Sequence, residues 1–393
     1  MIQTVEKDKM LLVDGPACVQ LLSGKTSVLG APIKTGERVV VRKGKRVAIE
    51  ALTDSRFELT LGDSASCAKT GEGAVPSSWR DACAEILSRK GRKTVLVLGR
   101  ADSGKTSFCT YLVNSALNMK QQAALIDGDL GQSDIGSPGT IGLTVVREPV
   151  TDLFTLWAEE FVFLGVTSPS KKVSETIDAL ATLKRQALER DADFLVVNTD
   201  GWAEGEEAAS YKVRLVRTVA PDFVVAIQGE SELASVIEAL SDLKTLAVDS
   251  PKNIKNRDRE TRKLLRESAY RKYLKEGKVR SFPLSWVGIE GDLKLNTVSR
   301  NQSEGTSEER SREEAPHEGL STEQEAALRE GDEEGLLVGL QNGSGRFLGI
   351  GTICNIDPYK RFIRVYTPVE EPVSKIKIGR IILDRAGNEV GLI

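Results

Sequence analysis

Two hydrophobic patterns divide most of the chain. From about residue 10 to residue 73, short runs rich in Val, Leu and Ile alternate with Gly, Asp and Lys turns at close intervals, as in ERVVVRKGKRVAIEAL and RFELTLGD. This spacing predicts a small β-sandwich in residues 1–73. Further along, continuous apolar runs alternate with amphipathic segments. Because such runs are typical of strands that are covered on both faces, we predict an α/β domain with a parallel sheet in residues 74–297.

The strand-like runs of this domain are TVLVLG, AALIDGD, FVFLGV, DFLVVNT, DFVVAIQ and TLAVDS, with loops expected directly after AALIDGD. A helix should precede the first strand, in VPSSWRDACAEILSRKGRK. Ser78 is placed to cap this helix and Gly91 to end it. One side of the helix would carry Trp79, Cys83 and Ile86 or Leu87.

Beyond residue 297 the patterns change again. Residues 298–334 contain few aliphatic and no aromatic residues and are strongly charged, which predicts a disordered acidic linker with a short helix in STEQEAALRE. Residues 335–393 alternate like strands around Gly and Asn-Gly turns, which predicts a small C-terminal β domain.

The composition excludes several classes of protein. Of the 393 residues, 40% are hydrophobic and 28% charged, as in ordinary globular proteins, and no apolar run reaches the roughly 18 residues of a membrane helix. The N-terminal segment MIQTVEKDKM carries charges of both signs where a secretory signal would be apolar. We therefore expect an intracellular protein, cytoplasmic in an archaeon or nuclear in a eukaryote.

Cysteine and histidine usage narrows the chemistry. The five cysteines are scattered and form no CxxC pair, which argues against disulfides and thiolate zinc sites and favours small buried hydrophobes: Cys18, Cys67, Cys83, Cys109 and Cys354. His317, in a polar tract, is the single histidine, which leaves almost no room for Ser-His-Asp hydrolysis, Cys-His nucleophilic catalysis or a multi-histidine metal site. Catalysis would depend on carboxylates, amines, guanidinium groups and backbone amides.

The net charge of −3 conceals a segregation of charge. Between Arg300 and Glu334, twelve acidic residues face four arginines, which leaves −8 on this segment and +5 on the rest of the chain. Residues 252–275 contain ten Lys or Arg and three acids on a segment with helical spacing. A basic helix suits a polyanionic partner, although an exposed face of salt bridges is the alternative.

A phosphate-binding motif follows the first predicted strand of the α/β domain. TVLVLGRADSGKTSF matches GxxxxGK[ST] from Gly99 to Thr106 between a strand and a helix. In this motif the loop amides hold phosphate oxygens, the lysine (Lys105) reaches the β and γ phosphates, and the hydroxyl of Thr106 holds Mg²⁺. The motif predicts ATP and Mg²⁺ as cofactors, with a chance glycine-rich turn as the alternative.

Two carboxylates end the second strand. Asp127 and Asp129, in ALIDGDLGQSDIGSPG, would lie at the carboxyl edge of the sheet, where doubly wound domains bind their ligands. There they could hold Mg²⁺ and accept a proton from an attacking hydroxyl group. The alternative is a turn-forming acid, which we favour only for Asp134.

Three segments together carry a family resemblance. DGDLGQSDIGSPGTIG, VNTDGW and RDRETRKLLRESAYRKYL resemble the polyribonucleotide 5′-hydroxyl-kinase family, P-loop enzymes that phosphorylate the 5′ end of RNA. The family includes archaeal polynucleotide kinases and the kinase subunit of the mRNA-cleavage and tRNA-splicing machinery. Its mRNA-cleavage type has the same three-part layout of β, α/β and β domains.

The resemblance implies roles for individual residues. The ATP-binding loop would comprise Gly99, Ala101, Asp102, Ser103, Gly104, Lys105, Thr106 and Ser107. Asp129 would accept the proton of the 5′-hydroxyl, with Gln132 near the transferred phosphate and Asp127 in an outer magnesium shell. Thr167, Ser168 and Pro169 would form a clasp on the substrate phosphate, although Ser170 stands where the family commonly has Gly.

The resemblance also implies an aromatic platform and a lid. Trp202 would stack on the terminal base, which contributes about 1–3 kcal/mol per base for any sequence. The alternative is a core residue, as we assume for Trp157. The lid would span residues 252–275, where Arg257, Arg262, Arg266 and Arg271 recur at helical spacing. Arg262 and Arg266 would stabilise charge on the transferring phosphoryl group, and Arg257 would bind substrate, unless these arginines only contact RNA phosphates nonspecifically.

These expectations combine into one prediction. The protein would transfer the γ-phosphoryl group of ATP to the 5′-hydroxyl of RNA, or of DNA as well, together with partner proteins of RNA processing and away from membranes. Two alternatives remain open. An ATP-binding scaffold would hold ATP without transferring phosphate, and a partner-regulated ATPase would hydrolyse ATP and ignore nucleic acid.

Overall fold

The computed structural model describes residues 1–71, 75–190, 192–229, 231–291, 333–357 and 360–392. The chain forms two compact units, Met1–Lys275 with Arg385–Glu389, and Glu276–Asp384 with Val390–Ile393. The predicted acidic linker, its short helix and His317 lie outside the described residues, apart from positions 333 and 334.

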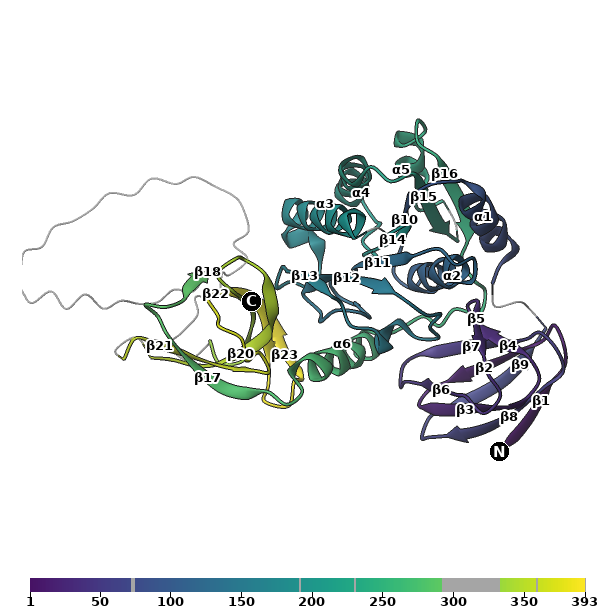
Figure 1. Ribbon diagram of the computed structural model, residues 1–393, viewed down its shortest axis with the longest axis horizontal. Helices are drawn as coiled ribbons and strands as arrows, with labels where there is room; N and C mark the ends of the chain where they lie inside the picture. Colours follow the sequence, from purple (N-terminus) through teal and green to yellow (C-terminus); the bar gives the residue numbers. More distant parts are fainter. Residues whose placement is uncertain (72–74, 191, 230, 292–332, 358–359, 393) are drawn as a thin grey trace, which may run out of the picture. The chain divides into compact units, whose positions relative to one another are not determined.

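The N-terminal strands form two antiparallel sheets that share one core (Figure 1). One sheet has the order β1 (Ile2–Val5), β8 (Ser55–Leu61), β3 (Ala17–Ser23) and β6 (Arg38–Val41). The other has the order β5 (Ala31–Ile33), β4 (Thr26–Val28), β7 (Arg46–Ala51), β2 (Met10–Asp14) and β9 (Ser66–Thr70). Alternation places Phe57 and Leu59 of β8 against Val13 and Ile49 of the facing sheet, so the predicted sandwich is confirmed.

The central domain is a seven-stranded sheet with helices on both faces (Figure 1). Its order is β13 (Glu160–Phe163), β12 (Thr140–Val146), β11 (Ala123–Gly128), β14 (Phe194–Thr199), β10 (Lys93–Gly99), β15 (Phe223–Gln228) and β16 (Thr245–Asp249). One face carries α3 (Val173–Glu189), α4 (Glu206–Val219) and α5 (Ala234–Ala239), and the other carries α1 (Ser77–Ser88) and α2 (Lys105–Asn118). Strand β10 is buried throughout, and its central residues are apolar because Leu96 and Leu98 contact the first helix layer while Val95 and Val97 contact the second.

The predicted α/β class is confirmed, but the sheet is mixed. Strands β12 and β13 run antiparallel to their neighbours, and β12 occupies a segment for which we expected loops. The chain reverses between β11 and β12 through a turn that includes Gly139 at φ 84°. Two short 3₁₀ turns, η1 (Leu153–Thr155) and η2 (Pro169–Lys171), complete the domain together with the basic helix α6 (Arg259–Leu274).

Helix α1 buries the predicted side chains but starts differently. Trp79, Cys83, Ile86 and Leu87 are buried as expected. The expectation that Ser78 caps the helix is wrong, because the helix follows Pro76 and the hydroxyl of Ser78 instead donates to the Asp249 carboxylate at 2.7 Å. The helix ends at Ser88, before Gly91.

The second unit is built on one sheet. Its order is β17 (Lys278–Pro283), β21 (Phe362–Thr367), β20 (Phe347–Asp357), β19 (Leu336–Gln341), β22 (Lys375–Leu383) and β18 (Gly288–Glu290), and β23 (Glu389–Leu392) pairs with β22. The predicted boundary at residue 297 differs from this division, because β17 pairs with β21 and β18 with β22. Val338 and Val365 lie in its core.

Two general expectations can be compared with the described part of the chain. Cys83 and Cys109 are buried, whereas Cys18, Cys67 and Cys354 are only half-buried, so the description as buried hydrophobes holds for two of the five. None of the helices in the described ranges combines the length and apolar character that crossing a membrane requires.

Candidate active site

The phosphate loop joins β10 to α2 in a conformation that depends on glycine. A Cβ on Gly99 would lie 2.4 Å from Ser103 Oγ and 3.0 Å from the Ile227 carbonyl oxygen, and Gly104 has φ 101°. Lys105 is buried, and its Nζ donates to the Arg100 carbonyl oxygen at 2.8 Å. Ser103 Oγ is buried without a hydrogen-bond partner among the described residues. A buried amine and an unsatisfied hydroxyl in a curled loop fit a triphosphate.

Lys105 and Asp129 influence each other across the pocket that both line. Burial lowers the pKa of Lys105 to about 8, and the Asp129 charge opposes this shift. Burial likewise raises the pKa of Asp129, and the Lys105 charge opposes that shift. In this pocket one group could act as a cation and the other as a proton acceptor.

The turn after β11 fixes the Asp129 carboxylate. Its Oδ1 accepts hydrogen bonds from the amides of Gly131 at 3.1 Å and Gln132 at 2.9 Å. The predicted clasp lies against this turn, since a Cβ on Gly131 would be 2.8 Å from the Thr167 carbonyl oxygen. Gln132 Nε2 donates to the Arg262 carbonyl oxygen at 3.2 Å, which links the turn to α6.

Asp127 lies deeper and accepts hydrogen bonds from four donors, one of which is the Asp129 amide at 3.3 Å. It also accepts from Asn198 Nδ2 at 2.9 Å, the Ser133 hydroxyl at 3.1 Å and the Asp134 amide at 2.8 Å. Burial, with repulsion from Asp129 and Asp134, raises the pKa of Asp127 to about 6. Asn198 Nδ2 also lies 3.5 Å from Thr106 Oγ1, so the Thr106 hydroxyl and the Asp127 carboxylate both contact the same amide group.

This oxygen-rich corner fits Mg²⁺, a hard cation that prefers oxygen ligands. In the described ranges, no group of three or more His, Cys, Asp or Glu residues forms a metal site. A cation there would consequently depend on Thr106, Asp127, water and the nucleotide phosphates together, as Mg²⁺ sites in nucleotide-binding enzymes commonly do.

The arginines of the basic segment have different partners. Asp102, in the phosphate loop at φ 56°, accepts from Arg262 Nη2 at 2.8 Å and from the Arg257 amide at 3.0 Å. Arg266 instead forms a two-pronged pair with the Glu389 carboxylate, at 2.6 and 2.8 Å. Arg271 pairs with Glu267, and Arg257 precedes the helix. Only Arg257 and Arg262 of the predicted stripe therefore line the pocket.

The two tryptophans of interest lie in contrasting environments. Trp202 is half-buried and stacks on Tyr211, with ring centroids 5.5 Å apart and planes at 22°. The assumption that Trp157 is a core residue is wrong, because 54% of its surface is exposed. The Lys272 amine of α6 instead lies over the Trp157 ring, 4.3 Å from its centroid, so Trp157 contacts α6.

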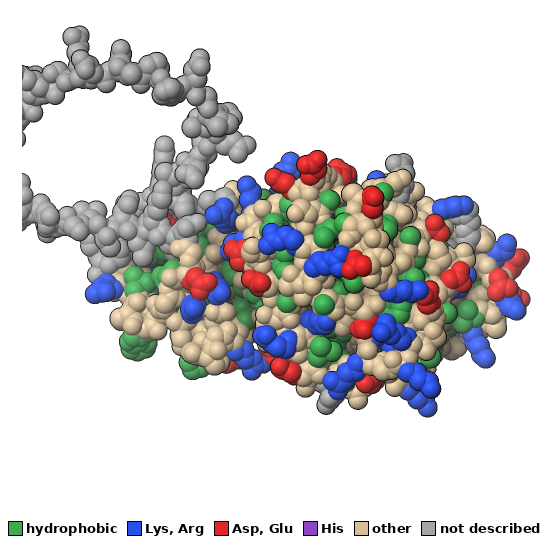
Figure 2. All heavy atoms as spheres, turned by 90° about the horizontal axis from the view of Figure 1, so that it is seen from above, with side chains coloured by type: hydrophobic (Ala, Val, Ile, Leu, Met, Phe, Trp, Pro, Cys, Tyr) green, Lys and Arg blue, Asp and Glu red, His purple; other side chains and the backbone are tan. Residues whose placement is uncertain are grey.

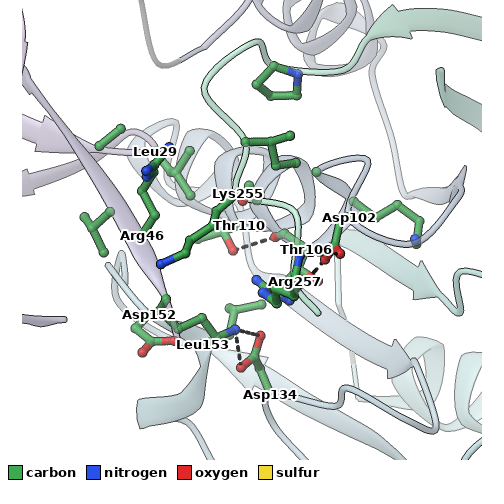
Figure 3. Close-up of a pocket in the computed structure, with 18 of the residues that line it drawn as sticks. Leu29, Arg46, Asp102, Thr106, Thr110, Asp134, Asp152, Leu153, Lys255 and Arg257 are labelled. Atoms are coloured by element: carbon green, nitrogen blue, oxygen red, sulfur yellow. Dashed lines mark hydrogen bonds and ion pairs between the residues drawn. The ribbon is translucent and has the colours of Figure 1, made fainter. Parts of the chain in front are cut away.

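A cavity of about 210 Å³ brings most of the predicted site together (Figure 3). The predicted residues that line it are Ala101, Asp102, Gly104, Lys105, Thr106, Ser107, Asp129, Gln132, Arg257 and Arg262. The predicted residues that are not part of its wall are Gly99, Ser103, Asp127, the clasp residues Thr167, Ser168 and Pro169, Trp202 and Arg266.

Sequence reasoning missed the opposite wall, which the N-terminal strands supply. Arg42 pairs with Asp152 at 2.8 Å and with Asp134 at 3.0 Å, and Lys45 pairs with Asp134 at 2.9 Å. Burial disfavours a charged Asp134, but Lys45 and Arg42 outweigh it and hold the pKa of this acid well below its usual value. Asp134 thus anchors the turn between β6 and β7 and is not simply a turn-forming acid, and the basic sequence RKGKR of that turn was the available signal.

Comparison with known proteins identifies the central domain. Residues 99–276 match the family model described as mRNA cleavage and polyadenylation factor CLP1 P-loop. This segment belongs to the CLP1 P-loop family. The resemblance drawn from the motifs is therefore confirmed at the level of the family.

Relatives match over most of the chain at modest identity. A polyribonucleotide 5′-hydroxyl-kinase of Pyrococcus furiosus is 27% identical over 344 residues, covering 81% of this chain and 96% of that protein. A polyribonucleotide 5′-hydroxyl-kinase of Methanocaldococcus jannaschii is 25% identical over 345 residues, covering 81% and 95%. A CLP1 homologue of Nematostella vectensis is 26% identical over 323 residues, covering 74% and 73%.

Among solved structures, the Clp1p chain of a Clp1p–Pcf11p complex has a TM-score of 0.75 with 12% identity, covering 97% of each chain. At this identity the likeness supports the fold alone, with N-terminal β sheets, a P-loop domain and a C-terminal β sheet. The match of residues 99–276 to a P-loop family agrees with the phosphate-binding loop described above.

Proposed function

We propose that this protein is an ATP-dependent polynucleotide kinase that transfers the γ-phosphoryl group to the 5′-hydroxyl of RNA. The observation that carries this proposal is that Lys105, Asp129 and Arg262 line one pocket. Phosphoryl transfer needs little covalent chemistry from the protein, and a cation, a proton acceptor and a guanidinium are the groups that it requires.

The nucleotide would occupy the cavity with its phosphates on the loop from Gly99 to Thr106. Lys105 would leave the Arg100 carbonyl and bind the β and γ phosphates. The base would lie against the apolar part of the wall that the N-terminal strands supply, which includes Val40 and Val47. Thr106 and Asp127 would hold Mg²⁺, which supplies positive charge to the β and γ oxygens.

The acceptor hydroxyl would be activated by Asp129. Its carboxylate would take the proton as the 5′ oxygen bonds to the γ phosphorus and the bond from that phosphorus to the ADP oxygen breaks. The amides of Gly131 and Gln132 keep the carboxylate oriented. Arg262 would neutralise the equatorial oxygens of the transferring group, which requires it to leave or share its bond with Asp102.

The acceptor strand would be recognised at its end. Trp202 would stack on the terminal base, and the loop Thr167–Pro169, beside the Asp129 turn, would hold the adjoining phosphate. Over the visible face in Figure 2, Lys and Arg side chains are interspersed with Asp and Glu, which favours recognition of an end over a broad basic track. We include DNA ends and partner proteins of RNA processing in the proposal.

The test is transfer of label from γ-labelled ATP. Wild-type protein with Mg²⁺ should label an RNA oligonucleotide that bears a 5′-hydroxyl but not the same oligonucleotide bearing a 5′-phosphate. The Asp129→Asn variant should bind ATP yet label neither. Intact ATP binding without label on any RNA or DNA end would contradict the proposal.

A second candidate is an ATP-binding scaffold in an mRNA-cleavage complex. The family description, and the pairing of Arg262 with Asp102 rather than with open pocket, favour it. A scaffold would retain ATP stoichiometrically through purification and transfer no phosphate. The same labelling experiment distinguishes the two functions.

A further inference from the structure

A buried ion pair lies beneath the loop that carries Trp202, outside the groups used above. Lys212 of α4 is fully buried, and its Nζ lies 2.9 Å from Asp200 Oδ1 and donates to the Asp200 carbonyl oxygen at 3.0 Å. Asp200 is the first residue after β14, so this lysine binds both the side chain and the backbone at the point where the loop begins.

The remaining lone pairs of Asp200 shape the loop. Oδ2 accepts from the Tyr211 hydroxyl at 2.7 Å, and Oδ1 accepts from the Trp202 amide at 2.9 Å. Two consecutive residues of α4 and one amide of the loop therefore converge on a single carboxylate. A carboxylate with this many donors has little freedom to move.

The loop that carries Trp202 contacts α4 on one side and the phosphate loop on the other. The buried ring of Tyr211 stacks on Trp202 at 5.5 Å. On the other side, a Cβ on Gly201 would lie 2.7 Å from both Cα and N of Ala101. The loop is consequently held between α4 and the ATP-binding loop, which leaves no room for it to shift independently.

An ion pair is a poor choice if only stability is needed. Replacing a buried ion pair by apolar residues of similar volume is often neutral or stabilising. Here the pair also lies close to the phosphate loop, since Gly201, the residue after Asp200, packs against the backbone of Ala101. Directional bonds to the loop explain its presence better than packing.

We propose that Asp200, Tyr211 and Lys212 are positioning residues that hold the Trp202 indole at a fixed place relative to the phosphate loop. The terminal base of the acceptor strand then stacks on a platform that is already ordered, and its 5′-hydroxyl is delivered to Asp129. This inference rests on the proposed function. A preformed platform improves acceptor binding because no loop has to be ordered at that moment.

The Tyr211→Phe variant gives the sharpest test, because it keeps the ring that stacks on Trp202 and deletes the hydroxyl that bonds Asp200. We expect the KM for a 5′-hydroxyl RNA dinucleotide to rise about tenfold, as for loss of a hydrogen bond to a charged group. The KM for ATP and kcat should stay within about twofold. Lys212→Met should act in the same direction.

Two controls separate positioning from general loosening. Lys184→Met removes a lysine whose Nζ donates to the Val219 and Ala220 carbonyl oxygens at the far end of α4, and it should leave the acceptor KM unchanged. In a Trp202→Ala background, Tyr211→Phe should add nothing, since the platform is already gone.

The outcomes distinguish the two proposals. If wild-type protein labels RNA but Tyr211→Phe keeps the wild-type acceptor KM, or adds its full effect without Trp202, this inference is overturned and the kinase function stands. If Lys212→Met fails to fold, the folded Tyr211→Phe variant still decides the matter. A wild-type chain that neither binds nor labels the dinucleotide overturns both.

Discussion

The low pKa of Lys105 predicts that nucleotide binding takes up a proton. In the free protein, burial lowers this pKa from 10.5 to about 8. Phosphate oxygens around the amine would return the pKa to its ordinary value or above, a change of roughly 2.5 units, or about 3 kcal/mol. At pH 8.5 only about a quarter of the free protein carries the proton, so binding should take up about three-quarters of a proton.

The sign and size of the pH dependence follow from the same values. Because the bound state holds more protons than the free state above pH 8, ATP affinity should fall as pH rises, by about thirtyfold between pH 7 and pH 9.5. Near pH 7 uptake should drop to about a tenth of a proton, since Lys105 is then charged in both states.

Titration calorimetry in two buffers with different ionisation enthalpies measures this uptake directly. Lys105→Met should bind more weakly, and its remaining affinity should not change between pH 8 and 9.5. Lys272 is the matched control, because burial also lowers its pKa to about 8 but its amine lies over the Trp157 ring, outside the pocket wall. Uptake near zero at pH 8.5 in wild type, or uptake lost in Lys272→Met, would refute this reasoning.

Three further predictions concern side chains of the pocket. Asp129→Asn should lower kcat by about 10²–10⁴-fold with ATP affinity kept, and a normal rate of label transfer would exclude Asp129 as the proton acceptor. Arg262→Ala should lower kcat by at least about 10³-fold. Arg266→Ala should chiefly lower the free energy of unfolding, by about 3–5 kcal/mol, because it leaves Glu389 buried and unpaired. Equal losses of kcat in both variants would contradict this division. Arg42→Met should lower the free energy of unfolding in urea by about 3–5 kcal/mol, since Asp152 loses its ion-pair partner and Asp134 keeps only Lys45. An unchanged midpoint would show that the contact made by Arg42 adds little.

The features that the sequence revealed are those that neighbouring residues determine. Gly99, Gly104 and Lys105 form the phosphate loop through backbone geometry within a few residues, so the spacing was enough to predict it. Asp127 and Asp129 follow a buried strand, and the edge of a sheet is where a strand must end.

The features that it did not reveal depend on distant segments. Arg42 and Asp152 are 110 positions apart, and nothing in either segment specifies the other. Arg262 and Arg266 stand four residues apart on one helix, which predicts a common face but not a common partner. Their separation arises because Asp102 approaches one turn of α6 while Glu389, 123 positions after Arg266, approaches the next.

Strand β12 was missed for a related reason. The predicted loops after Asp129 do reverse the chain, but the reversal ends in a paired strand because Leu143 and Val146 find apolar neighbours on the face shared by α3 or α2. Likewise, Trp157 is an apolar residue and was expected in the core, but the Lys272 amine of α6 contacts its ring at the surface.

The most direct measurement of the central claim is a crystal structure of the protein with Mg²⁺, a non-hydrolysable ATP analogue and a 5′-hydroxyl RNA dinucleotide. The account predicts the 5′ oxygen within hydrogen-bond distance of the Asp129 carboxylate, in line with the γ phosphorus, and the Lys105 amine on the γ phosphate. A 5′ end bound away from Asp129, with the nucleotide in place on Lys105, would contradict it.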